Sequence, residues 1–346
     1  MPKVILFRDP ACLQHDTGRG HPECADRLRA IDAGLHESGV EEQVTSLAPR
    51  DATRDDLCRV HRPDYVDQIL ALRGRHLALD ADTHVSPGST QAALLAAGAA
   101  IEAVDTVLDT PGQVAFSLMR PPGHHAEADR AMGFCLFNNV AVAAAYALAK
   151  KGLNRVLIFD PDVHHGNGTQ HIFEKRQDVF YISIHQYPFY PGTGGLEETG
   201  KEAGKGFTAN APLPPGLGDA DYLYLTQNLV LPLIDAYRPE LVLFSAGFDA
   251  HAEDPLAQME VTDAGFQGMF GALGAHLESA RIPYLFILEG GYALPVLRRL
   301  VPALIQNVVR GTFPGESSGK PHEAAVRAVN MLCPKEFHFL SNQGLQ

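Results

Sequence analysis

Residues 156–168 read VLIFDPDVHHGNG, an apolar run that ends in a cluster of carboxylates and histidines. The apolar part, 156–160, is continuous rather than alternating in hydrophobicity, which is typical of a parallel strand covered by helices on both faces. Runs of the same kind predict further strands at 4–7, 114–118, 179–184, 241–245 and 284–288. The sequence therefore predicts a parallel sheet, with the polar end of this stretch at its carboxyl edge.

Longer Ala- and Leu-rich stretches lie between the predicted strands and favour helices. These are expected at 90–108, 138–151, 222–236, 263–280 and 294–310. Alternation of strands and helices predicts an α/β fold with an open, mostly parallel sheet flanked by helices. No repeat or linker interrupts the pattern, so we expect a single domain over residues 1–313. Residues 314–346 are expected to form an irregular C-terminal extension, packed on the domain or trailing from it.

The composition is that of a globular chain of 346 residues, with 45% hydrophobic and 20% charged residues. A net charge of −13 argues against a nucleic-acid partner and favours either solubility or attraction of a cationic substrate. The N-terminus lacks a signal-peptide pattern, and no run of about 18 apolar residues predicts a membrane span. Five scattered cysteines without a CxxC motif indicate reduced thiols. We therefore expect a cytoplasmic protein without a membrane partner.

Polar clusters follow four of the predicted strands. They are RPPGHH at 120–125, PDVHHGNG at 161–168, AGFD at 246–249 and EGGY at 289–292. Open α/β sheets bind their ligands at the carboxyl ends of the strands. We therefore expect the four clusters to converge on one site.

The DPDVH segment indicates a metal site. Asp160, Asp162 and His164 occupy alternate positions, which point to the same side of an extended chain. With Asp249 as a third ligand, Asp162 and His164 would form a three-ligand set with an open position, as in catalytic zinc sites. Two carboxylates and an imidazole also suit Fe²⁺ or Mn²⁺, so the ligand types leave the metal open. The alternative interpretation is a capped turn with a core histidine.

The tandem histidines indicate acid–base chemistry. His124 and His125 follow a stiff Pro-Pro-Gly turn, and adjacent side chains in an extended segment point apart. We interpret them as a general acid/base and an electrostatic partner. Such a pair requires groups that orient the far ring nitrogens, and Asp160 and Asn167 are the candidates.

Tyr292 is the fourth chemical group of the predicted site. It follows Gly290 and Gly291, which permit a sharp turn that presents the phenol. A phenol near a metal can donate to a carbonyl oxygen as negative charge develops there. The alternative is a core tyrosine that caps a helix.

Taken together, these motifs resemble the zinc-dependent histone deacetylase family of the arginase/deacetylase fold. The resemblance is greatest to its class II-like bacterial members, the histone deacetylase-like amidohydrolases. The matching stretches follow the order of the family and cover about residues 20 to 300. They are HPECADRL (21–28), VHRPDYV (60–66), RPPGHHA (120–126), MGFCLFNN (132–139), DPDVHHGNGTQ (160–170), ISIHQ (182–186), PGTG (191–194), AGFDAHAEDPL (246–256) and LEGGY (288–292).

The resemblance implies a hydrolase that removes acetyl or short acyl groups from lysine ε-amino groups and releases acetate. The implied Zn²⁺ ligands are Asp162, His164 and Asp249. His125 would be the general base toward the metal-activated water, and His124 would be the second histidine, paired with Asp160. Tyr292 would polarise the acyl carbonyl.

The resemblance also implies residues that bind substrate, product and a second ion. The walls of a narrow acyl-lysine tunnel would include Gly133, Phe134, Tyr190 and Leu256. Arg27 would line an internal acetate cavity. A structural K⁺ would lie near Asp160, Asp162, His164, Ser183 and Ile184. The loop 84–89 is a candidate for contacts in a homo-oligomer.

Some positions depart from the family pattern. Asn167 stands where class I members carry an aspartate, which matches the class II-like pattern and weakens the group that orients His125. Pro161 replaces a bulky residue between the two aspartates, which predicts a slightly different geometry beside the metal. Leu256 is apolar where a polyamine-selective member carries a glutamate. Tyr292 is retained, so we expect activity on acetyl-lysine.

Three other functions compete with lysine deacetylation. An acetylpolyamine amidohydrolase would use the same chemistry on a different amine, to which the net charge is also suited. A binuclear hydrolase of arginase type needs further bridging carboxylates, but Gly166 and His251 stand where that design requires acids. A non-hydrolytic acyl-binding pocket protein would not need the complete set of catalytic groups.

Overall fold

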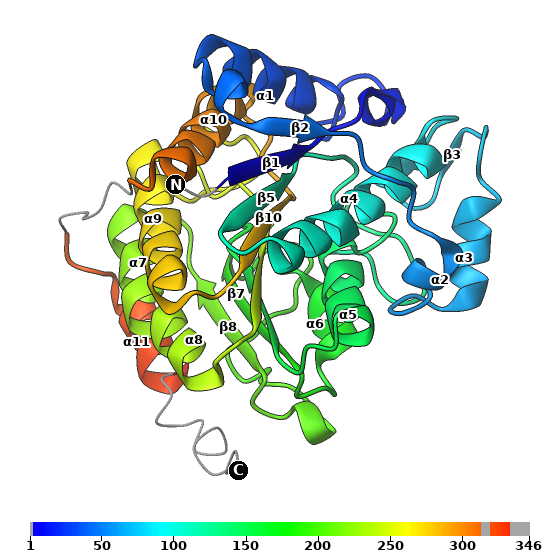
Figure 1. Cartoon of the computed structure of the whole chain (residues 1–346). Coiled ribbons are helices and arrows are strands. Elements are labelled where there is room, and N and C mark those ends of the chain that lie inside the picture. Colours follow the sequence, from blue (N-terminus) through cyan, green and yellow to red (C-terminus); the bar gives the residue numbers. More distant parts are fainter. Residues whose placement is uncertain (1–2, 313–318, 333–346) are drawn as a thin grey trace.

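A computed structural model describes residues 3–312 and 319–332, and a single eight-stranded sheet lies at the centre of these residues. The spatial order of its strands is β2-β1-β5-β10-β9-β6-β7-β8, and each pair of neighbours is parallel (Figure 1). The strands are β1 (Lys3–Phe7), β2 (Thr45–Leu47), β5 (Gln113–Ser117), β6 (Val156–Asp160), β7 (Val179–Gln186), β8 (Thr208–Leu213), β9 (Leu241–Ala246) and β10 (Tyr284–Leu288). A separate antiparallel pair consists of β3 (Leu77–Ala78) and β4 (His84–Val85). The predicted α/β class with a parallel sheet is confirmed.

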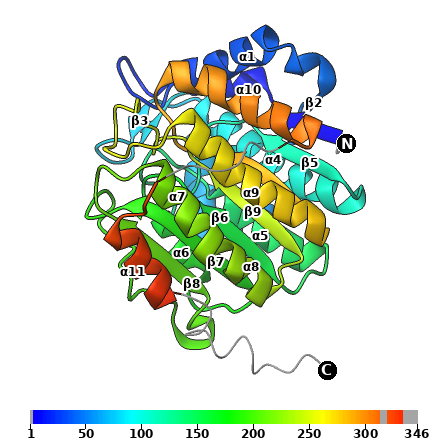
Figure 2. The same ribbon diagram turned by 90° about the vertical axis from the view of Figure 1, so that its left-hand side faces the viewer.

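Helices cover both faces of the sheet (Figures 1 and 2). One layer comprises α4 (Ser89–Asp109), α5 (Asn139–Lys150) and α6 (Asn167–Phe173), with α2 (Arg54–Leu57) and α3 (Pro63–Leu70) outside it. The other comprises α7 (Asp219–Leu225), α8 (Leu231–Tyr237), α9 (Asp263–Ala280) and α10 (Leu294–Arg310), with α1 (Asp26–Glu37) packed on α10. Short 3₁₀ helices occur at Pro10–Gln14, Val40–Gln43 and Glu202–Gly204.

Two strands of this sheet were not predicted from the sequence, β2 and β8, and they are its edges. The short pair β3 and β4 was not predicted either. β2 has only three residues and is partly exposed, so it has no continuous apolar run. β8 contains Asn210 and Pro212, which are disfavoured in strands; an edge strand tolerates proline because one side needs no ladder hydrogen bonds. Hydrophobic runs therefore identify the inner strands better than the outer ones.

Two helical predictions need correction. The helix predicted at 222–236 is interrupted by a π-helical turn at Thr226–Val230, which separates α7 from α8. The C-terminal extension, predicted to be irregular, contains α11 (Glu323–Leu332), whose buried side chains include Ala325 and Leu332. This helix packs against α7 and β8. Residues 314–318 and 333–346 of the extension lie outside the described residues, and the domain boundary stays a prediction.

The long helix α4 is apolar enough to span a membrane by length and composition alone. However, 72% of its most apolar window is buried inside the protein, where it packs against β1, β5 and β10. Its apolar surface is thus explained by the core. The segment 84–89, expected to be a contact loop, comprises β4, a turn at 86–88 and the first residue of α4. Ser86 and Ser89 are buried there, and the Ser89 hydroxyl bonds to His15.

The sheet places the four polar clusters side by side. The strands that precede them are β5, β10, β9 and β6, which are consecutive in the sheet although they are far apart in the chain. Because all four are parallel, their carboxyl ends meet at one edge. The predicted convergence therefore follows from the strand order.

Candidate active site

Asp162, His164 and Asp249 come together at the carboxyl ends of β6 and β9. One ligand atom from each lies within 4.8 Å of the others, and all three residues are buried. His164 Nδ1 is 3.3 Å from an oxygen of Asp162 and 3.2 Å from an oxygen of Asp249. The three predicted ligands therefore face one point, and Pro161 does not prevent this.

Backbone groups hold the two carboxylates in place. The Gly290 amide donates to Asp162 Oδ2 (2.8 Å), and the Val163 amide donates to Asp249 Oδ1 (2.8 Å). A Cβ atom on Gly290 would lie 2.0 Å from Asp249 Oδ2, and one on Gly247 would lie 2.1 Å from Asp162 Oδ2. Only glycine fits at these positions, which explains the glycines that follow β9 and β10.

The two carboxylates of the Asp162–His164–Asp249 group have no Lys or Arg ion-pair partner among the described residues, so the group suits a metal ion. Burial and the charge of Asp162 raise the pKa of Asp249 to about 7. Burial opposes ionisation of Asp162, but His124 and His164 outweigh it and hold the pKa of Asp162 below its usual value. Each described ion pair of these two carboxylates is with a histidine rather than with Lys or Arg. Two carboxylates and one imidazole fit a divalent cation.

Within residues 3–312 and 319–332, Asp162, His164 and Asp249 are the only group of three or more His, Cys, Asp or Glu side chains that could hold a metal ion. Gly166 has no side chain to contribute, and His251 Nε2 pairs with Asp263 at 3.0 Å. The described residues therefore do not provide the bridging acids of a binuclear centre.

His124 is backed directly by a buried carboxylate. Its Nδ1 lies 3.1 Å from Asp160 Oδ2, which also accepts from the Tyr181 hydroxyl (2.9 Å). Burial alone would lower the pKa of His124, but the charges of Asp162 and Asp160 outweigh it and raise that pKa well above its usual value. The two carboxylates therefore favour the protonated form of His124.

His125 is backed by an amide instead. Its Nδ1 lies 2.8 Å from Asn167 Oδ1, and its ring centroid is 4.0 Å from that of His124. Burial, followed by the charges of His124 and His164, lowers the pKa of His125 well below its usual value. A neutral ring that donates from Nδ1 to Asn167 leaves Nε2 free to accept a proton. Gly133 packs against this ring so closely that a Cβ there would lie 2.4 Å from His125 Cδ2.

Tyr292, in the loop after β10, contacts Arg27 of α1. The Arg27 guanidinium lies 5.0 Å from the centre of the Tyr292 ring, and its Nε donates to the Gly291 carbonyl (2.7 Å). Burial and the charges of Asp249 and Asp162 outweigh Arg27 and raise the pKa of Tyr292 well above its usual value. The phenol is therefore protonated.

Aromatic rings from two loops surround these groups. Phe134 lies edge-on to Tyr292 with centroids 5.8 Å apart, and Tyr190 lies edge-on to His125 at 5.1 Å. Phe189 stacks on His164 at 5.4 Å. The contact found for Leu256 is not with these rings: its backbone amide donates to Asp254 Oδ1 (3.0 Å). Of the predicted tunnel residues, Phe134 packs on Tyr292, Tyr190 packs on His125, and the backbone of Gly133 packs on the His125 ring.

Two of the residues predicted to bind a monovalent cation, Asp160 and Ser183, lie side by side on β6 and β7. Asp160 and Ser183 are partners in register, and Ile184 follows Ser183. All of the residues in this predicted set are buried: Asp160, Asp162, His164, Ser183 and Ile184.

Several buried groups that hold the site had no predicted role. The Glu289 carboxylate accepts from the backbone amides of Gly123 (2.6 Å) and His124 (3.1 Å), so it positions the histidine loop. Asp254 accepts from the Tyr292 amide (2.6 Å) and so positions the tyrosine loop. The signal for Glu289 is a lone carboxylate at the end of a wholly apolar strand. Asp254 has no comparable signal in the sequence.

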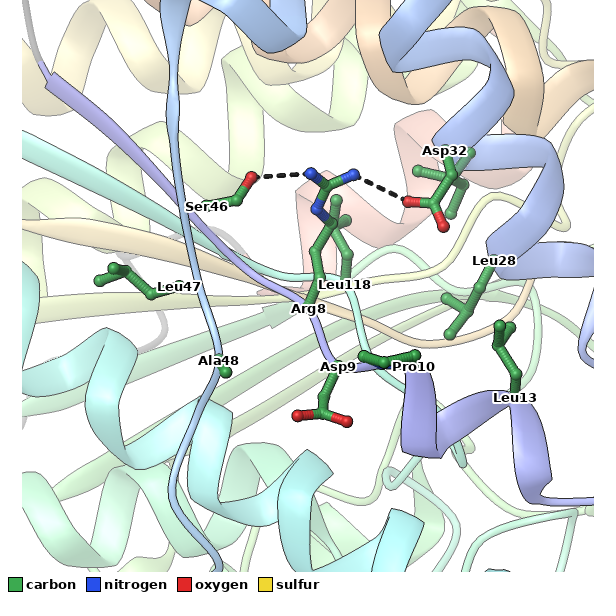
Figure 3. A pocket seen from close by; sticks show the side chains of 11 residues that line it. Arg8, Asp9, Pro10, Leu13, Leu28, Asp32, Ser46, Leu47, Ala48 and Leu118 are labelled. Carbon is green, nitrogen blue, oxygen red and sulfur yellow. Dashed lines mark hydrogen bonds and ion pairs between the residues drawn. The ribbon is translucent and has the colours of Figure 1, made fainter.

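A separate hollow of about 330 Å³ opens near the carboxyl end of β1 (Figure 3). Its most polar lining group, Arg8, donates to Asp32 (2.9 Å), Ser46 (2.9 Å) and Glu41 (2.7 Å). Because the guanidinium is already paired, this hollow offers no reactive group comparable with those at the strand ends.

The chain matches the histone deacetylase domain family over residues 21–308. It is 39% identical to the histone deacetylase-like amidohydrolase of Pseudomonas aeruginosa, over 84% of this chain and 82% of that protein. It is 42% identical to histone deacetylase 15 of Arabidopsis thaliana, over 83% of this chain and 52% of that protein. It is 38% identical to the human polyamine deacetylase HDAC10, over 94% of this chain and 49% of that protein. The chain thus spans about half the length of the plant and human relatives.

A solved structure supports the same relationship. The crystal structure of the HDA15 HD domain aligns with a TM-score of 0.89 at 38% identity, covering 98% of this chain and 96% of that one. With the family match and the bacterial relative, this shows that the chain belongs to the histone deacetylase family.

Proposed function

We propose that this protein is a metal-dependent amide hydrolase that removes acetyl, or a related short acyl group, from lysine ε-amino groups and releases acetate. The observation that carries the proposal is the buried Asp162–His164–Asp249 group beside His125, whose Nδ1 contacts Asn167 Oδ1. Burial lowers the pKa of His125, which favours a neutral ring with Nε2 able to accept a proton. Tyr292 follows β10 at the same edge of the sheet, and burial keeps its phenol protonated. Family membership supports deacetylation as the class of reaction.

Asp162, His164 and Asp249 would hold the metal, which we propose to be Zn²⁺, with Fe²⁺ as the alternative that the same ligands accommodate. When bound, a divalent ion of this kind polarises a carbonyl oxygen and makes a water molecule more acidic. We also propose a structural K⁺ near Asp160, Asp162, His164, Ser183 and Ile184.

The protein side chains would move the proton and stabilise the developing charge. His125 Nε2 accepts a proton from water while Asn167 holds the Nδ1–H, and water oxygen adds to the acyl carbon. Tyr292 donates to the carbonyl oxygen as negative charge develops there, and the positive charge of His124 lies nearby. His125 then returns the proton to the amine nitrogen as the C–N bond breaks. The products are acetate and a free amine.

The surroundings of the site support an acyl-lysine substrate. Phe134, Phe189 and Tyr190 provide apolar surface that suits the methylene chain of an acyl-lysine. An acetylated polyamine is the second candidate, because a relative is named a polyamine deacetylase and the net charge of −13 favours cations. The apolar Leu256 favours the lysine substrate. We further propose a reducing, cytoplasmic location, in keeping with free thiols at Cys12, Cys24, Cys58 and Cys135.

The test compares kcat/KM of the Zn²⁺-loaded protein on an acetyl-lysine peptide and on N-acetylputrescine, with chelator-treated protein as the control. We expect a preference of more than about 100-fold for the peptide, or about 2.7 kcal/mol of transition-state discrimination. The same preference for N-acetylputrescine would identify an acetylpolyamine amidohydrolase. Turnover of neither substrate by metal-loaded protein would contradict deacetylation and favour a binding-only protein.

A further inference from the structure

Glu127 lies directly behind Asn167, on the side away from His125, and has no role in the mechanism above. Its Oε1 accepts from Asn167 Nδ2 at 2.6 Å. His171 Nδ1 lies 2.9 Å from Oε1 and 3.1 Å from Oε2 of the same carboxylate. A continuous chain of hydrogen bonds, His125–Asn167–Glu127–His171, therefore runs from the site toward the surface, where the His171 side chain is 37% exposed.

The amide at Asn167 creates a problem that an aspartate would not. A side-chain amide has a carbonyl oxygen that accepts and an NH₂ group that donates, and it can be placed either way round. With its oxygen toward His125, the ring carries its proton on Nδ1 and Nε2 can accept. With its NH₂ toward His125, Nδ1 must accept and the proton lies on Nε2, which blocks the base. The orientation of one amide thus decides whether His125 can act.

Glu127 provides what fixes this orientation. A carboxylate offers acceptors only, so it bonds to the NH₂ end of Asn167 and not to the oxygen. The other atoms near Asn167 Nδ2 are also acceptors: the His125 carbonyl oxygen at 3.3 Å and Met132 Sδ at 3.4 Å. The bond to Glu127 is the shortest of the three and is charge-assisted.

The Glu127 carboxylate is itself held in place. Its side chain is 10% exposed, its backbone amide donates to the Arg130 carbonyl (3.0 Å), and its carbonyl oxygen lies 2.9 Å from His61 Nδ1. The bond to Glu127 is the main reason why the pKa of His171 is raised, with further contributions from Glu174 and, in opposition, burial and Lys201. Glu127 is therefore a fixed, partnered group rather than a mobile surface acid.

We propose that Glu127 is a positioning residue of this hydrolase, which fixes the Asn167 amide and, through it, the Nδ1–H tautomer of His125. The inference rests on the proposed function for its kinetic consequence, but the tautomer itself is a property of the protein without substrate. Class I members carry a carboxylate at the position of Asn167. In this chain the carboxylate is Glu127, which is connected to His125 only through the Asn167 amide.

The decisive variants exchange the amide and the carboxylate. Glu127→Gln keeps the size of the side chain but replaces the charge-assisted bond with one that an amide can make either way round. We expect it to lower kcat about ten-fold with little change in KM, metal content or Tm. The double substitution Asn167→Asp/Glu127→Gln transposes the two groups, so every hydrogen bond in the chain can re-form with a carboxylate directly on His125. We expect it to recover most of the lost kcat.

Two further measurements separate positioning from general effects. ¹⁵N chemical shifts of the histidine rings report the tautomer directly; we expect His125 as the Nδ1–H form in the wild type and as a mixture in Glu127→Gln. Asp129→Asn, which removes an exposed carboxylate from the same loop, is the matched control and should retain wild-type kcat. The ring shifts also test the proposal if the wild type fails to hydrolyse acetyl-lysine, so the two failures are distinguishable.

Several outcomes would overturn the proposal. One is wild-type kcat and unchanged His125 shifts in Glu127→Gln. Another is a loss of kcat that the double substitution does not recover, or an equal loss in Asp129→Asn. If Glu127→Gln folds poorly, the double variant still decides, because it preserves the hydrogen bonds between the side chains at positions 125, 167, 127 and 171. A His125 ring that is not in the Nδ1–H form in this variant contradicts the assignment.

Discussion

The two adjacent histidines, His124 and His125, differ in the hydrogen-bond partners of their Nδ1 atoms. Behind His124, the chain of contacts ends inside the protein, at a fully buried Asp160 that is also bound by Tyr181. Behind His125, the chain passes through the Asn167 amide to Glu127 and reaches the partly exposed His171. Two identical residues, 4.0 Å apart between ring centroids, thus have different partners.

The difference shows that the charges and hydrogen-bond partners around His124 and His125 determine which of them is charged and which is neutral. The charges of Asp162 and of Asp160, which contacts His124 directly, outweigh burial and raise the pKa of His124. An amide on His125 does not compensate for burial or for the neighbouring positive charges, and the pKa of His125 is lowered. One histidine is therefore suited to hold a fixed charge and the other to accept a proton. Each of the following predictions removes or weakens one side of this contrast.

The largest effect is expected from His125→Ala, which removes the proton acceptor. We expect kcat/KM on an acetyl-lysine peptide to fall about 10³-fold, because general base catalysis is lost. Metal content should be unchanged, because the imidazole is not among the three converging ligands. Substantial remaining activity would remove His125 from this role.

On the other side, Asp160→Asn tests whether the His124 region depends on a buried charge. Replacing the carboxylate leaves a buried histidine without its direct partner, so we expect the free energy of unfolding to fall by about 3 kcal/mol. Urea unfolding of the wild type and the variant measures this. A change below about 1 kcal/mol would mean that Asp160 is not needed to balance the charge on His124.

Tyr292→Phe provides a reference that leaves both histidine regions intact. The phenol acts on developing charge, so we expect kcat to fall about 100-fold with metal retained and KM little changed. Steady-state kinetics with metal analysis by mass spectrometry tests this. Loss of metal in this variant would show that the role of Tyr292 is assigned wrongly.

The smallest effect concerns His171, at the surface end of the hydrogen-bond chain that starts at His125. Glu127 raises the pKa of His171, so the stability from this pair is fully present below the ordinary histidine pKa, about 6.5, and is lost as pH rises through the raised value. Because His171 is partly exposed, we expect His171→Gln to cost less than about 1 kcal/mol at pH 5.5 and nearly nothing at pH 9. Urea unfolding at both pH values measures the difference. The pH dependence should disappear in a Glu127→Gln background, and its persistence there would assign it to another partner.

Much of the fold could be predicted from the sequence because the inner strands are buried on both faces. The run 156–160 reads as a strand for this reason, and β6 coincides with it. The strand order could not be predicted, since β5 and β10 are neighbours across almost 170 residues of chain. α11 was not predicted, although its buried residues Ala325, Ala328, Val329 and Leu332 have helical spacing, because the helix is short and follows the last predicted strand–helix pair.

The reactive groups of the site could likewise be predicted from the strand ends, but their supporting groups could not. Asp162, His164 and Asp249 stand in recognisable spacings with glycines beside them. Glu127 and Asp254 act through backbone amides or through another side chain, which leaves no periodic pattern in the sequence. Their roles depend on loop geometry that only the folded chain defines.

The central claim, a single metal centre at Asp162, His164 and Asp249 that supports deacetylation, is tested most directly by Asp249→Ala. The measurement is metal bound per chain together with acetate released from an acetyl-lysine peptide, for the wild type and the variant. We expect one catalytic divalent ion and acetate release in the wild type, and neither in the variant. Full metal occupancy and turnover in Asp249→Ala would contradict the account and place the metal elsewhere.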